Sequence, residues 1–355
     1  MGVVINLYTG NHRHIWGISD YVDMIRRSFL YANLSIEFHV SDQIRPNVIN
    51  IILEEFSETQ TVDYFKKIKK SDPSTKLWLF LTEVPNAGSY NLFSWSRKCK
   101  TQFVKVADKI FKLTESGSAY DLYFPRGIST LSNETVSSRI IRKSKKGFNK
   151  LASVVNRVAH NERYFYHRYV NTIENWNLFD EHFVIHDKVI PFFEGLDVKY
   201  FYYAIPSIDW NIQSRPYWCY FSGTLTKYRK NLLLGKFKAI QDKILIQAEV
   251  NDVIRDNYLS QSYFSIALPR YEEWRFSSPT RTISSLRYGS LPLEVVPSIW
   301  DEFEEPIFLD FQTLLDKIDD ISGLYNAQVE LVQNARATRN KQSFHFIHQL
   351  LDRYI

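Results

Sequence analysis

Cysteine, glycine and long apolar runs are all scarce in this sequence. Only two of the 355 residues are cysteines, Cys99 and Cys219, which excludes a disulfide-rich secreted scaffold and a four-thiolate zinc site. Glycine contributes 12 residues, too few for a collagen-like or glycine-rich linker architecture. No apolar stretch reaches the roughly 18 residues that a membrane span needs. The N-terminal residues lack the basic start and apolar core of a signal peptide. We therefore expect a cytoplasmic protein.

Motifs for common cofactors and metals are also missing. The sequence has no Gly-x-Gly-x-x-Gly fingerprint, no Gly-Lys-Ser/Thr loop and no His-Glu-x-x-His helix. His182 and His186 stand four apart on a predicted strand, which separates them by about 13 Å, too far to share a metal. We expect no cofactor and no metal.

Apolar and aromatic residues are abundant, at 45% and 15% of the chain, so a large core is expected. Short apolar runs alternate with segments of helical periodicity. Continuous apolar strands are buried on both faces, which favours a parallel sheet covered by helices. The predicted strands are residues 3–8, 48–53, 77–81, 183–186, 200–204, 217–221, 243–250, 263–268, 291–295 and 306–309. The predicted helices include residues 61–70, 94–114, 227–239, 251–260, 280–288, 311–318 and 322–354, and a helix after residue 18 capped by Ser19 or Asp20.

A polar, turn-rich segment at residues 207–216 separates two such series. The sequence therefore predicts an α/β protein with two halves, residues 1–206 and 207–333, followed by helical residues 334–355. We find no internal repeat at a fixed short period.

Two strand-to-helix junctions in the second half predict anion binding. Gly223 lets the backbone approach a ligand closely, and the next helix begins with basic residues. At the second junction Ser278 and Arg281 open a helix, where N–H groups and a guanidinium bind phosphate. Ligands bind at the carboxyl ends of strands in such sheets, so a diphosphate held by both junctions is expected; ordinary surface helix starts are the alternative. The predicted set is Gly223, Arg229, Lys230, Arg270, Ser277, Ser278, Thr280 and Arg281.

The same region resembles the donor-binding domain of GT-B glycosyltransferases, in particular the exostosin-like group. The resemblance covers residues 217–296, while the first half matches only in layout. The sequence departs from the group at Ser290, where cysteine is common. The matching residues are Phe221, Gly223, Arg229, Ser262, Phe264, Leu268, Pro269, Ser278, Arg281, Gly289 and Pro292.

This resemblance implies two Rossmann-like domains facing a cleft. Residues 1–206 would bind the acceptor, residues 207–333 would bind a nucleotide-sugar donor, and residues 334–355 would cross back to the first domain. Arg229, Lys230 and Arg281 would stabilise the leaving diphosphate without a metal, and Glu294 would accept hydrogen bonds from a ribose or sugar hydroxyl.

An inverting transfer also needs a general base at a carboxyl strand end of the first half. Glu83 is our first candidate, followed by Glu55 and Asp20, and His14 in the first loop also qualifies; a surface charge or helix cap is the alternative for each carboxylate. Retaining GT-B enzymes often carry two glutamates seven residues apart in this region. This sequence lacks such a pair, so inversion of the anomeric configuration is slightly favoured. The first loop supplies the acceptor-binding candidates His14, Trp16 and Gly17.

The net charge of +5 is mildly basic. Basic clusters at residues 66–70 and 139–150 are either solvated surface or an attraction to the phosphates of a membrane, a lipid-linked acceptor or nucleic acid. The expected function is transfer of a sugar to a glycan or lipid-linked glycan in surface-polysaccharide synthesis, at the inner membrane surface and without nucleic acid. A non-catalytic nucleic-acid or polysaccharide-binding α/β protein is the alternative, and a GT-B-type epimerase is a third candidate.

Overall fold

The computed structural model describes residues 2–12, 18–54, 56, 59–86, 88–90, 101–102, 105, 164–208, 210, 215–248, 250–270 and 272–354. The predictions for His14, Trp16, Gly17, Glu55 and the basic run 139–150 lie outside this set. The chain forms two compact units. The larger contains Met1–Glu55, Asp63–Val84 and Trp176–Ile355, and the smaller contains Phe56–Val62 and Pro85–Asn175.

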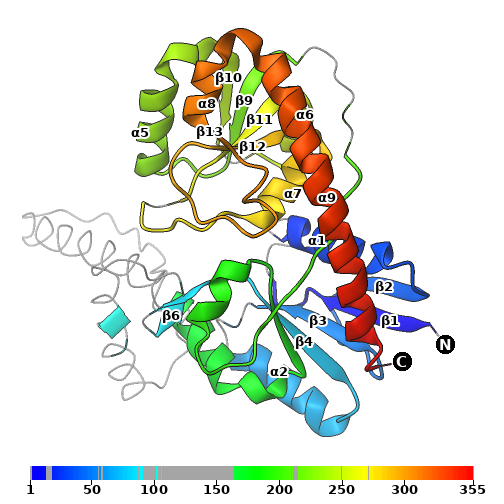
Figure 1. The fold of residues 1–355 in the computed structure, drawn as a ribbon. Coiled ribbons are helices and arrows are strands. Elements are labelled where there is room, and N and C mark those ends of the chain that lie inside the picture. The colour runs from blue at the N-terminus through cyan, green and yellow to red at the C-terminus, as the bar shows by residue number, and fades with distance from the viewer. Residues whose placement is uncertain are drawn as a thin grey trace, which may run out of the picture. The chain divides into compact units, whose positions relative to one another are not determined.

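The larger unit contains two parallel sheets with helices, so the predicted α/β class with parallel sheets is confirmed. The first sheet has the strand order β2-β1-β3-β4-β7-β8 (Figure 1). Among the interior strands, β1, β3 and β4 are largely apolar and mostly buried, as expected for strands covered on both faces, with Asn6 and Asn50 as buried polar residues. The elements are β1 (Val3–Tyr8), α1 (Ser19–Tyr31), β2 (Ile36–Ser41), β3 (Ile49–Leu53), α2 (Thr59–Ser71), β4 (Lys76–Leu81), η2 (Trp176–Leu178), β7 (Glu181–Val184), η3 (Asp187–Phe192) and β8 (Lys199–Tyr200).

The second sheet has the order β10-β9-β11-β12-β13. All of its neighbouring strands are parallel, so the carboxyl ends of the strands lie at one edge. The predicted boundary at residue 207 falls between the two sheets, which belong to the same compact unit. The elements are β9 (Tyr217–Ser222), α5 (Lys227–Lys236), η4 (Phe237–Lys243), β10 (Ile244–Gln247), α6 (Asp252–Ser260), β11 (Ser262–Ala267), α7 (Pro279–Arg287), β12 (Leu291–Glu294), β13 (Leu309–Asp310), α8 (Phe311–Asp316), η5 (Ile318–Asp320) and α9 (Ile321–Leu351).

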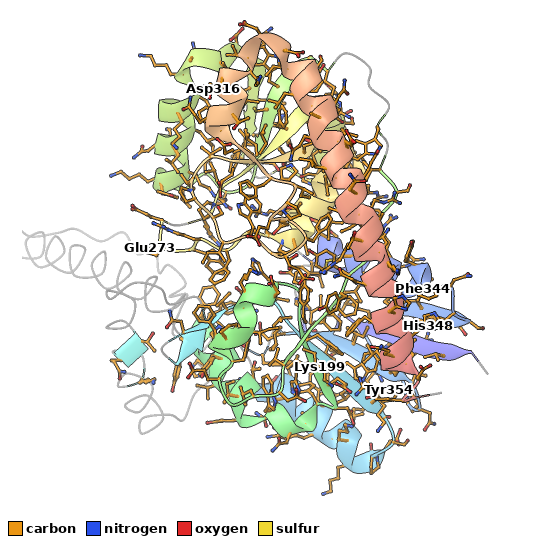
Figure 2. All side chains as sticks on the ribbon, in the orientation of Figure 1. Lys199, Glu273, Asp316, Phe344, His348 and Tyr354 are labelled. Atoms are coloured by element: carbon orange, nitrogen blue, oxygen red, sulfur yellow. The ribbon has the colours of Figure 1, made fainter. Side chains whose placement is uncertain are left out.

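The closing helix α9 is 31 residues long and runs from the second sheet to the first (Figure 1). Near its start, the hydroxyl of Tyr325 donates to Gly289 O at 2.6 Å. Near its end, the Phe346 ring packs edge-on against Phe183 and Phe201 of the first sheet's core. Figure 2 shows Phe344, His348 and Tyr354 along this last part of the chain. The predicted long helix is therefore confirmed, and its two ends pack against different sheets.

Two local predictions are wrong for a shared reason. Neither Ser19 nor Asp20 caps α1: the N-cap is Ile18, with no side-chain cap. The Ser19 hydroxyl instead donates to Asp252 at 2.8 Å, and Asp20 pairs with Arg255. Contacts made across the fold thus replace the local contact that the sequence suggested.

The strand predicted at residues 200–204 pairs with β7 at Tyr200, and Phe201 N donates to Val184 O at 2.8 Å, but the ladder ends there. Side chains replace the missing partner strand, because Ser28 Oγ accepts from Ala204 N at 2.8 Å and Asn340 Oδ1 accepts from Ile205 N at 2.7 Å. A single-sequence pattern cannot distinguish these side-chain acceptors from a neighbouring strand. The sequence also missed β2, an edge strand with no fully buried residue.

In the smaller unit, β5 (Pro85–Asn86) and β6 (Ser89–Tyr90) form an antiparallel pair, and residues 164–174 are helical. Asn171 in this helix donates to Phe56 O at 2.6 Å. The structure contains no described helix that is both long and apolar enough to cross a bilayer.

The buried ring of His182 on β7 leads us to expect that the protein loses folding stability in acid. Its ring stacks on Trp176 at 3.8 Å between centroids, and burial lowers its pKa to about 4. The unfolded chain therefore binds more protons between that value and about 6.5. The stabilising contribution is complete above this range and is lost as the pH falls through it.

His182→Phe keeps a ring but cannot titrate. Between neutral and acidic pH, we therefore expect its free energy of unfolding to fall by about 3 kcal/mol less than that of the unchanged protein. Urea unfolding at several pH values measures this difference. Parallel pH profiles for the variant and the unchanged protein would show that His182 does not titrate as described.

Candidate functional site

The carboxyl edge of the second sheet brings together Gly223, Arg229 and Arg281. Gly223 follows β9 and has φ +130°, a conformation that favours glycine. A Cβ placed on Gly223 would lie 3.5 Å from Nη1 of Arg229 and 3.7 Å and 3.9 Å from Nη1 and Nη2 of Arg281. Guanidinium groups from α5 and α7 therefore converge on one backbone position.

Arg229 joins two loops at this edge. Its side chain is buried and donates to the carbonyl oxygens of Thr224 at 3.1 Å, Leu268 at 2.7 Å and Pro269 at 3.1 Å. Thr226 caps α5 by accepting from Arg229 N, which fixes the start of the same helix. These carbonyls are neutral, so the three bonds hold the guanidinium in place without cancelling its charge.

Arg281 lies in the first turn of α7 and is accessible to solvent. The surrounding protein nevertheless lowers its pKa by desolvation, while Asp20 and Tyr21 on α1 oppose this effect and Arg255 and Arg270 add to it. Arg281 is therefore accessible to water while protein atoms crowd its guanidinium. Within the described part of the chain, its guanidinium donates no hydrogen bond and forms no ion pair.

The first turn of α7 adds hydroxyl groups to this edge. Ser278 is the N-cap, but its side chain caps no backbone N–H, and its hydroxyl lies 3.2 Å from that of Thr280. The Ser277 hydroxyl donates to Glu304 and faces His186, so it is engaged within the protein. Ser278 and Arg281 are thus the first-turn residues best able to meet an anion.

The other predicted donor residues occupy different surroundings. Lys230 on α5 and Arg270 after β11 are exposed. Glu294 ends β12, where its Oε1 accepts from Ser298 N and Trp300 Nε1, both at 2.7 Å. This carboxylate orders the loop that follows the strand, and among the described residues its Oε2 accepts no hydrogen bond.

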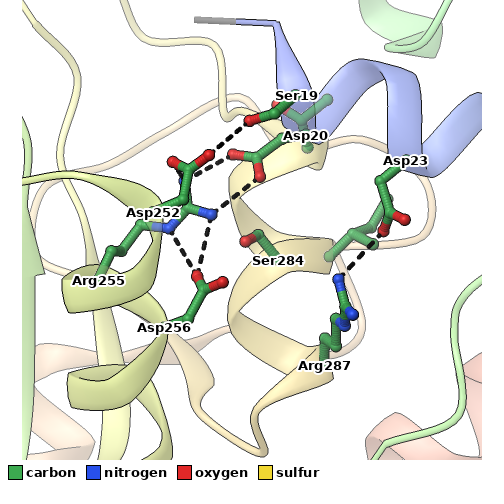
Figure 3. A pocket seen from close by; sticks show the side chains of 10 residues that line it. Ser19, Asp20, Asp23, Asp252, Arg255, Asp256, Ser284 and Arg287 are labelled. Atoms are coloured by element: carbon green, nitrogen blue, oxygen red, sulfur yellow. Dashed lines mark hydrogen bonds and ion pairs between the residues drawn. The ribbon is translucent and has the colours of Figure 1, made fainter. Parts of the chain in front are cut away.

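Asp20, a predicted catalytic residue, forms a two-pronged ion pair with Arg255 on α6. The distances are 2.9 Å from Nη1 to Oδ2 and 3.0 Å from Nη2 to Oδ1. Burial raises the Asp20 pKa, with Arg255 opposing and Asp252 and Asp256 adding to the rise. The pair borders a pocket of about 150 Å³ between α1, α6 and α7 (Figure 3). In the described structure Asp20 therefore links the two sheets' helices.

Glu83 and Glu54 lie at the carboxyl edge of the first sheet, where Asp42 follows β2 and Asp187 follows β7. Glu83, the first-choice base, is half-buried two residues after β4. Glu54, which sequence reasoning passed over in favour of Glu55, is fully buried after β3 and accepts from the Thr82 hydroxyl at 3.2 Å. The sequence feature that could have identified Glu54 is its position directly after an apolar strand.

Sequence reasoning also missed a buried polar cluster that involves the ends of β7 and β12. Glu304 is fully buried and accepts from the hydroxyls of Ser277 and Thr282. Burial, with the charge of Asp301 adding to it, raises the pKa of Glu304 to about 8. Asp301 accepts from the hydroxyls of Tyr200 at 2.5 Å and Tyr203 at 2.8 Å. The acidic run at residues 301–305 was the available signal, but nothing in the sequence joined it to His186.

Comparison with known proteins gives no further guidance to this site. The chain matches no protein-family model, and no curated protein matches it in sequence.

Proposed function

We propose that this protein is a glycosyltransferase that binds a nucleoside-diphosphate sugar at the carboxyl edge of the second sheet. The observation that carries the proposal is the convergence of Arg229 and Arg281 on Gly223, beside the start of α7. A diphosphate offers several anionic oxygens, which guanidinium groups and helix N-termini bind well. Arg229 is held by three carbonyl oxygens, while the exposed guanidinium of Arg281 is left to contact the ligand.

The proposed architecture is that of two Rossmann-like domains facing a cleft, the GT-B arrangement. The parallel strand orders and the helix that packs against both sheets support it. In this arrangement the first sheet binds a glycan or lipid-linked acceptor, and Glu83 accepts the proton of the attacking hydroxyl. The positive charges of Arg229 and Arg281 stabilise the leaving diphosphate as the glycosidic bond breaks.

Thermal unfolding of the full chain with UDP, GDP, CMP and dTDP tests this binding. We expect one diphosphate to raise the unfolding midpoint. Arg281→Ala should weaken its binding by about tenfold to a hundredfold, because a charge-assisted hydrogen bond contributes about 1.5–3 kcal/mol. Isothermal titration supplies the dissociation constants.

Arg287→Ala is the matched control, since Arg287 lies on the same helix but pairs with Asp23 at 3.5 Å. This variant should bind the nucleotide as the unchanged protein does. Equal affinity in the Arg281 and Arg287 variants would refute the proposed site. Glu83→Gln should bind the donor normally but transfer no sugar; normal transfer would assign the base elsewhere.

A further inference from the structure

Three side chains with metal-binding atoms meet in the larger unit, and none of them belongs to the guanidinium site. His186 follows β7, Asp187 opens η3, and Asp301 lies in the loop after β12. A ring nitrogen of His186 and one carboxylate oxygen from each aspartate lie within 4.8 Å of one another. The two aspartates are 114 residues apart, so no local motif announced them.

The protonation of His186 can be deduced from its partners. Its Nε2 lies 3.1 Å from the carbonyl oxygen of Ile299. A carbonyl oxygen only accepts, so Nε2 carries the hydrogen and the neutral ring presents a lone pair at Nδ1. This is the arrangement typical of a metal-binding histidine, whose second nitrogen donates to a backbone carbonyl.

Nδ1 of His186 is in an unusual position for a buried nitrogen. The residue is 5% exposed, and among the described atoms Nδ1 has no hydrogen-bond partner. It lies 3.8 Å from Oδ1 of Asp187. Two lone pairs that face each other without an intervening hydrogen are unfavourable, whereas a cation bound by both would satisfy them.

The two aspartates are held in place by other groups. Asp301 is fully buried and accepts from the Tyr203 hydroxyl at 2.8 Å and from Phe303 N at 2.9 Å. Oδ1 of Asp187 accepts from Glu302 N at 3.1 Å. The longest of these hydrogen bonds joins Asp187 N to Asp301 Oδ2 at 3.4 Å, and a bound ion could replace it. Such outer hydrogen bonds orient metal ligands before the ion arrives.

We propose that His186, Asp187 and Asp301 bind one divalent first-row transition cation, of the Mn²⁺ or Zn²⁺ type. Imidazole nitrogen with two carboxylates suits these ions, whereas Mg²⁺ prefers oxygen ligands alone. The ligands follow strands of different sheets, so the ion connects the carboxyl ends of β7 and β12. This role is structural and does not depend on the proposed sugar transfer.

Metal titration of the full-length protein, stripped with a chelator, tests the proposal. We expect one Mn²⁺ or Zn²⁺ per chain by calorimetry and elemental analysis. At a hundredfold excess over the dissociation constant, the unfolding midpoint should rise by about 5 °C. MgCl₂ should give no comparable rise. An absence of stoichiometric binding of both transition ions to the unchanged protein would overturn the proposal, whatever the variants do.

His186→Ala and Asp187→Asn should each weaken ion binding at least tenfold. Asp187→Asn keeps the side-chain shape at a partly exposed position, so this variant should fold even if His186→Ala does not. His39→Ala is the control, because His39 also lies beside a carboxylate, 2.7 Å from Glu37, but on the surface. Unchanged ion affinity in folded His186→Ala or Asp187→Asn protein, or equal loss in His39→Ala, would show that the ion binds elsewhere.

Discussion

Replacing Arg339 with alanine is expected to lower the free energy of unfolding by about 3–5 kcal/mol, the largest effect on stability that we predict. Arg339 on α9 is 2% exposed and pairs with Glu302 at 2.6 Å. It also donates to the Tyr200 hydroxyl, and its guanidinium lies 4.3 Å from the ring centre of Tyr203. Truncation would leave a cavity and deprive Glu302 and Tyr200 of their charged partner.

Arg353→Ala is the matched control for this prediction. Arg353 follows α9 and also pairs with a carboxylate, Glu181, at 3.0 Å, but its side chain is 53% exposed. Glu181 is buried but keeps Lys199 as a second partner, so removing the exposed Arg353 guanidinium should cost at most about 1 kcal/mol. Denaturant unfolding of both variants measures the contrast, and a similar small loss in each would contradict the structural role of Arg339.

Arg229→Ala is expected to cost about 3 kcal/mol and to remove nucleotide binding together with stability. Three carbonyl oxygens lose their donor at once, and a buried polar group left without a partner costs about 1–3 kcal/mol. The loops after β9 and β11 would then separate, which displaces Gly223 and Arg281. Arg229→Lys should restore only part of the loss, because a single ammonium cannot match the fork geometry of a guanidinium.

Lys230→Ala tests whether the loss of stability is specific to removal of the buried Arg229 side chain. Lys230 is the next residue on α5 and is exposed, so its removal should change the unfolding free energy by no more than about 0.5 kcal/mol. Denaturant unfolding and nucleotide titration of the three variants distinguish the outcomes. A stable Arg229→Ala protein that still binds nucleotide would show that the contacts of Arg229 with the two loops are separate from the nucleotide-binding site.

The amino-acid sequence by itself determined the parallel α/β architecture. The apolar run at residues 77–81 forms a strand because burial on both faces favours an unbroken apolar segment. The start of α7 was equally readable, since Ser278 and Pro279 are local start signals. The likeness of residues 217–296 to a donor-binding domain directed attention to Gly223, Arg229 and Arg281, and their use in binding a sugar donor stays a prediction.

Only the tertiary structure decided which polar groups meet. Asp20 was expected to cap a helix or act as a base, but it pairs with Arg255 because α6 brings a guanidinium within reach. His186, Asp187 and Asp301 come together only when β7 and β12 are placed by their sheets. A local pattern records which side chains share a face of one element. The energy of a buried charge depends on partners that are distant in sequence, so this energy can be judged only from the assembled fold.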